Sequence, residues 1–62
     1  AYVTSVKTLY SELLPDYQYL LKSVTEIKEA ADAENNYLVS AKMDEFIASY
    51  AKTIWMLNQA LL

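Results

Sequence analysis

The sequence predicts an all-α protein folded as an antiparallel helical hairpin, and three observations indicate this fold class. The chain of 62 residues contains no Gly, so the tight two-residue turns that join β-strands are improbable. No stretch alternates apolar and polar residues as a half-buried strand does. Two apolar heptad patterns run along the chain, and they are out of phase by one residue at Asn35-Asn36. Because one straight helix cannot hold both patterns on one face, we expect the chain to fold back at this slip.

The first helix is predicted over about residues 2–33, where apolar residues recur at alternating steps of three and four. The positions of this stripe are Val3, Val6, Tyr10, Leu13, Tyr17, Leu20, Val24, Ile27 and Ala31.

Pro15 lies within this first helix, although a proline removes a backbone hydrogen bond and clashes with the preceding turn. A helix could end near Leu13 and a second could begin with Pro15 at its first position. Alternatively, one helix runs through and is kinked at Pro15. The heptad keeps its phase across Pro15, which falls farthest from the apolar stripe. Since curved helices are convex toward solvent, the kinked helix is favoured.

The turn is predicted at about residues 32–36. Asn is second to Gly in the left-handed conformation that ends many helices, and it is a strong N-cap. Asn35 is therefore expected to end the first helix and Asn36 to cap the second. A turn this short makes the two helices antiparallel neighbours. A single long, bent helix in an oligomeric coiled coil is the alternative.

The second helix is predicted over about residues 37–61, and it is apolar on two sides. Its core stripe consists of Val39, Met43, Phe46, Ile47, Tyr50, Ile54, Leu57 and Leu61. The opposite side carries the candidate protein interface: Ala41, Ala48, Ala51, Trp55 and Leu62. Alanines allow helices to approach closely, and Trp is a frequent interface anchor. Alternatively, the alanines are simply good helix formers and Trp55 a solitary exposed aromatic.

The whole chain, residues 1–62, is predicted to be a single helical-hairpin domain. A chain of this size buries a marginal core and usually needs disulfides, a metal or oligomerisation. It contains neither Cys nor His, so disulfides are excluded and zinc is very improbable. Since 55% of the residues are apolar, more than a lone hairpin can cover, we expect a second copy to complete a four-helix bundle.

No catalytic, cofactor-binding or metal-binding residues are predicted. The carboxylates fall on flanking or outward helix positions, and the Glu-x-x-His motif of di-iron bundles cannot occur without His. The Ser and Thr residues have no adjacent base that would make them nucleophiles, so the chain is not expected to be an enzyme. Tyr10, Tyr17 and Tyr50 could line a small-ligand pocket, although tyrosines at such positions more often fill core volume.

The charge pattern argues against nucleic acid as a partner. The net charge is −3, and the five basic residues are all Lys, whereas Arg is preferred for phosphate and base recognition. The longest apolar run, Ile54 to Leu57, is far too short to span a membrane. No signal peptide is visible, and a cytoplasmic location is the expectation.

These observations predict a non-enzymatic oligomerisation or protein–protein interaction module. Its partner would be a second copy, as in a homodimer, or another protein. The alternatives are a small acidic regulator or inhibitor that binds one target protein in trans, and a small-ligand-binding helical bundle.

Overall fold

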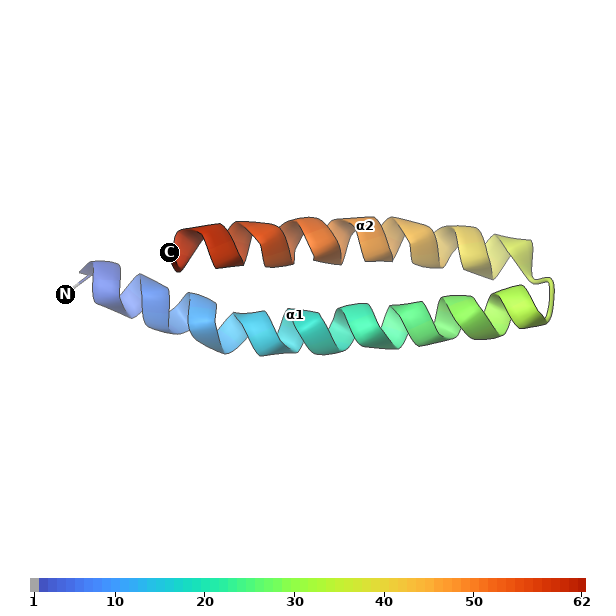
Figure 1. Cartoon of the computed structure of the whole chain (residues 1–62), viewed down its shortest axis with the longest axis horizontal. Helices are drawn as coiled ribbons and strands as arrows, with labels where there is room; N and C mark the ends of the chain where they lie inside the picture. The colour runs from blue at the N-terminus through green and yellow to red at the C-terminus, as the bar shows by residue number, and fades with distance from the viewer. Residues whose placement is uncertain (1) are drawn as a thin grey trace.

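The computed structural model describes residues 2–62, which form two α-helices and no strand. Helix α1 spans Tyr2–Ala33, and helix α2 spans Tyr37–Ala60. The helices lie side by side and run in opposite directions, so that the start of α1 and the end of α2 lie at the same end of the molecule (Figure 1). The predicted all-α antiparallel hairpin is confirmed.

Helix α1 is continuous through Pro15. Its ribbon changes direction in the N-terminal half, between the blue and cyan segments (Figure 1). One bent helix is therefore present, rather than two helices separated at Leu14.

The turn between the helices is built by two asparagines. Asn35 has a φ of 58°, the left-handed conformation that Asn tolerates better than most residues. The N–H of Asn36 donates to the carbonyl of Ala31 at 2.8 Å, and the N–H of Asn35 donates to the carbonyl of Asp32 at 3.1 Å. This pair of bonds is the Schellman motif. The Asn36 side chain then caps α2 by accepting from the N–H of Val39 at 3.2 Å.

The molecule is long and thin, with extents of 51 × 14 × 14 Å and a radius of gyration of 14.6 Å. A compact domain of this length would have a radius of gyration of about 10.6 Å. The solvent-accessible surface is 4674 Å², whereas a folded monomer of this mass exposes about 4,100 Å². The hairpin therefore leaves more surface in water than a self-contained protein of its size.

The core between the helices is correspondingly thin. Among the described residues, the buried apolar side chains are Val24, Ala31 and Leu57. An aromatic cluster lies midway along the hairpin, where Tyr17 meets Tyr50 edge-on, with ring centroids 5.9 Å apart. Several residues of the predicted core stripes are only partly covered, because two helices can shield each other on one side alone.

Candidate protein-interaction surfaces

The five residues predicted to form a protein interface lie on the solvent side of α2. All of them are exposed, and Trp55 is 63% exposed. Ala41, Ala48 and Trp55 recur every seven residues and so form one column along α2, with Ala51 beside it. Leu62 continues the same spacing but lies beyond the end of the helix at Ala60. We call these five residues the alanine–tryptophan stripe. The structure brings them together on one surface and assigns no partner to it.

A second apolar surface spans both helices. Contacts fix the register of the hairpin: Tyr17 lies against Tyr50, and the Lys28 Nζ donates to the Ser40 Oγ at 2.8 Å. In α1 the central column, which faces α2, is Tyr10, Tyr17, Val24 and Ala31, and in α2 the central column is Met43, Tyr50 and Leu57. On each helix a second column lies four residues before the central one, and these two second columns run beside each other. Because the helices are antiparallel, columns with the same offset lie on the same side of the hairpin. The paired layers are Val6 with Ala60, Leu13 with Thr53, Leu20 with Phe46, and Ile27 with Val39.

We call these four layers the two-helix face. Leu20 is 39%, Phe46 37% and Ile27 47% exposed, although all three belong to the core stripes read from the sequence. Leu9 and Met56 extend the apolar surface at its edges and are more than half exposed. Periodicity identified these positions as apolar, but it could not show which side of each stripe the other helix leaves open.

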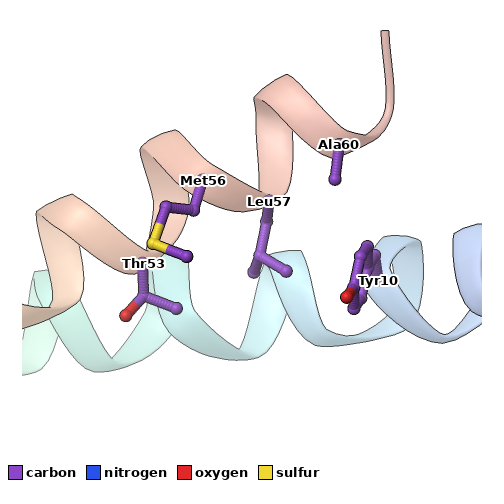
Figure 2. Close-up of a pocket in the computed structure, with 5 residues that line it drawn as sticks. All are labelled: Tyr10, Thr53, Met56, Leu57 and Ala60. Atoms are coloured by element: carbon purple, nitrogen blue, oxygen red, sulfur yellow. The ribbon is translucent and has the colours of Figure 1, made fainter.

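A hollow of about 270 Å³ lies near the end of the hairpin opposite the turn. It is lined by Tyr10 from α1 and by Thr53, Met56, Leu57 and Ala60 from α2 (Figure 2). Leu57 points toward α1, and Tyr10 lies beneath Ala60 (Figure 2). Pockets for small ligands usually measure about 300–1,000 Å³, so the hollow lies just below that range. Of the three tyrosines considered for a ligand pocket, it includes only Tyr10.

The turn end carries a polar cluster instead. The Lys28 ammonium contacts Asp44 at 3.1 Å and Asp32 at 3.6 Å. The buried Ser40 hydroxyl accepts from Lys28 and donates to the Asp32 carboxylate at 2.6 Å. The hydrogen bond to Asp44 raises the pKa of Lys28 above its ordinary value of 10.5. Desolvation acts against this increase, and the charges of Asp32 and Asp44 add to it. Every member of the cluster is paired, so it holds the two helices together.

No metal site appears in the described part of the chain. Residues 2–62 contain no group of three or more His, Cys, Asp or Glu residues that could hold a metal ion. Neither described helix is long and apolar enough to cross a membrane.

Comparison with known proteins finds a relative of similar sequence. The chain is 33% identical, over 55 residues, to the DNA protection during starvation protein of Helicobacter pylori (strain J99 / ATCC 700824). The similarity covers nearly the whole hairpin. The matched segment is 89% of this chain but only 38% of that protein. No protein-family model matches the chain, and no solved structure matches it.

Proposed function

We propose that the hairpin is a non-enzymatic assembly module, half of a four-helix bundle that a second copy completes. The observation that carries this proposal is the two-helix face, where Leu20, Ile27 and Phe46 remain exposed within columns of mostly apolar residues. An apolar surface that runs across both helices is typical of an interface rather than of a solvated side. A second hairpin would bury it in the way that helices bury their core positions in a bundle.

The alanine–tryptophan stripe would stay outside such a bundle, because it lies on the flank of α2 away from α1. We propose that it contacts a further subunit, with Trp55 as the anchor. Trp is enriched among interface residues that dominate binding, and the alanines beside it would let a second helix approach closely.

The relative supports a second candidate for the missing half of the bundle. More than half of the Helicobacter pylori protein lies outside the matched segment, which is room for another hairpin of this length. In this candidate, the two-helix face is covered by another part of one longer chain rather than by a second copy.

The name of the relative refers to protection of DNA, which is a statement about that protein. For this segment we propose a role in assembly, without direct contact with DNA. Its net charge of −3 and its lack of Arg disfavour binding to a phosphate backbone.

The test of the assembly module is the solution mass of the 62-residue chain, measured by light scattering over a dilution series with circular dichroism in parallel. We expect a helical dimer. A folded monomer at every concentration would contradict completion by a second copy. An unfolded monomer would instead support the second candidate, in which the other half of the bundle belongs to the same chain.

The stripe is tested by Trp55→Ala, with Tyr19→Ala as the matched control. Tyr19 is 71% exposed, yet it lies outside both apolar surfaces. Trp55→Ala should weaken association beyond the dimer by about 2 kcal/mol or more, the usual threshold for an anchor residue. Sedimentation equilibrium measures this step. A chain that never exceeds a dimer, or equal effects of the two variants, would contradict a role for the stripe.

A further inference from the structure

The two halves of the two-helix face differ in the size of their side chains. The half near the turn presents Leu20, Phe46 and Ile27, which are large and exposed. The half near the open end presents Val6 and Leu13 from α1 and the smaller Thr53 and Ala60 from α2, and these two α2 residues line the 270 Å³ hollow. The two-helix face therefore carries large, exposed side chains at the turn end and a hollow at the open end.

The face is large enough for a specific dimer. The hairpin measures 51 Å by 14 Å in its long and wide directions, which gives a footprint of about 700 Å² per copy and about 1,400 Å² for two copies. Stable, specific interfaces bury about 1,200–2,000 Å² in total. A second copy thus supplies the area that a stable dimer needs.

Two-fold symmetry allows this face to meet itself in two ways. If the turns of the two copies lie at the same end, the layer of Leu20 and Phe46 meets the same layer of the second copy, and one hollow meets the other. If the turns lie at opposite ends, this layer meets the Leu13 and Thr53 layer of the second copy. The same-end arrangement crowds two copies of Leu20 and Phe46 at one level and leaves the two hollows facing each other. The opposite-end arrangement sets each Phe46 against Thr53 beside the hollow, which suits close packing better.

We propose that two hairpins pack over this face with their turns at opposite ends, and that Phe46 of each copy occupies the hollow of the other. This proposal rests on the assembly module proposed above and specifies its partner and geometry. Helix α2 then packs on α2 of the second copy, and the two-fold exchange carries Phe46 onto Thr53, a residue that lines the hollow.

Contacts within one hairpin already hold the Phe46 ring in place. Its ring stacks on Tyr50, with centroids 6.0 Å apart, and the Lys42 ammonium lies 5.5 Å from its centroid. These contacts fix the ring and still leave the side chain 37% exposed. A ring that is already held loses little conformational entropy when a partner covers it.

Ser49 gives a direct test of the orientation. It is exposed and lies three residues after Phe46 and four before Thr53, so it shares their side of α2. In the proposed dimer it lies close to the two-fold axis, facing Ser49 of the second copy. With the turns at the same end, it would face α1 instead. The chain has no Cys, so Ser49→Cys introduces a single thiol.

We expect mild oxidation to link Ser49→Cys into a covalent dimer at least about tenfold more efficiently than Ser11→Cys, because only the first thiol lies within disulfide reach of its copy. Ser11 is also exposed, but it lies two residues from Leu9 and Leu13 and so faces another side of α1.

Filling the hollow provides an independent variant. Thr53→Trp should weaken the dimer at least about tenfold, since the indole would occupy the place of Phe46. Thr8→Trp is the matched control, because Thr8 and Thr53 both donate their hydroxyl to a carbonyl four residues earlier, at 3.0 and 3.1 Å. Thr8 lies outside the face. Circular dichroism would show that both variants keep their helices.

The outcomes separate this proposal from the assembly module. A dimer by mass that links through Ser49→Cys and is disrupted by Thr53→Trp supports the arrangement. A dimer that fails to link through Ser49→Cys overturns the arrangement and leaves the assembly module in place. A folded monomer of the unaltered chain overturns both.

Discussion

The two ends of the hairpin are held by different physical means. At the turn end, Asn35 and Asn36 complete a Schellman motif and a cap, and Lys28 joins α1 to Ser40 and Asp44 of α2. At the open end, the helices meet mainly through apolar contact, with Leu57 buried beside an unfilled hollow. Directional polar contacts define the register of the helices at the turn end, whereas apolar contacts at the open end leave a hollow between side chains. The turn end should therefore be stabilised by contacts within one hairpin, whereas the stability of the open end should depend on assembly with another molecule.

The largest expected effect is at the open end. Leu57 is 7% exposed, and Leu57→Ala should destabilise the hairpin by about 2–5 kcal/mol, through lost burial and an enlarged hollow. Urea denaturation followed by circular dichroism measures the change at fixed concentration. Leu38→Ala is the control, since it removes the same side chain at a position on α2 that is 83% exposed and outside both apolar surfaces. Equal losses in the two variants would show that Leu57 does not hold the open end.

At the turn end, Asn36→Ala removes the side chain that caps α2 through the N–H of Val39. Loss of an N-cap typically destabilises a protein by about 1 kcal/mol, so this effect should be smaller than that of Leu57→Ala. Because the cap is local, the loss should be the same at high and low protein concentration. Asn58→Ala, in the exposed last turns of α2, serves as the control. A loss that varies with concentration would contradict a purely local role.

The smallest expected effect concerns Lys28 and pH. The hydrogen bond to Asp44 and the nearby carboxylates raise the pKa of Lys28 above 10.5. A raised folded-state pKa means that its contribution is complete below pH 10.5 and is lost as the pH rises through the folded-state value. Stability relative to Lys28→Gln should therefore be constant near neutral pH and decline above 10.5. Lys22→Gln is the control for general effects of alkaline pH on stability. An equal decline of stability in the unaltered chain, Lys28→Gln and Lys22→Gln would exclude the Lys28 cluster as its cause.

The sequence predicted the hairpin because its signals are local. The one-residue slip of the heptads, the two asparagines and the preserved phase across Pro15 each depend on neighbouring residues, and the structure has a left-handed Asn35, a capping Asn36 and a continuous α1.

The cluster of Lys28, Ser40 and Asp44 was not predicted, because it depends on the register of one helix against the other. The exposure of Leu20, Ile27 and Phe46 was missed for a similar reason: periodicity marks a residue as apolar but does not say what covers it. The alanine–tryptophan stripe is exposed, as expected for an interface, and its partner remains a proposal.

The antiparallel course of the chain also determines where anything attached to it must go. The start of α1 and the end of α2 share one pole, and the turn lies at the other end of a rod 51 Å long (Figure 1). A label, a tether or further polypeptide joined to either terminus would therefore leave from the same pole. In the proposed dimer, the chain ends of the two copies lie at opposite ends of the rod. Segments joined to one copy would therefore be held apart from segments joined to the other.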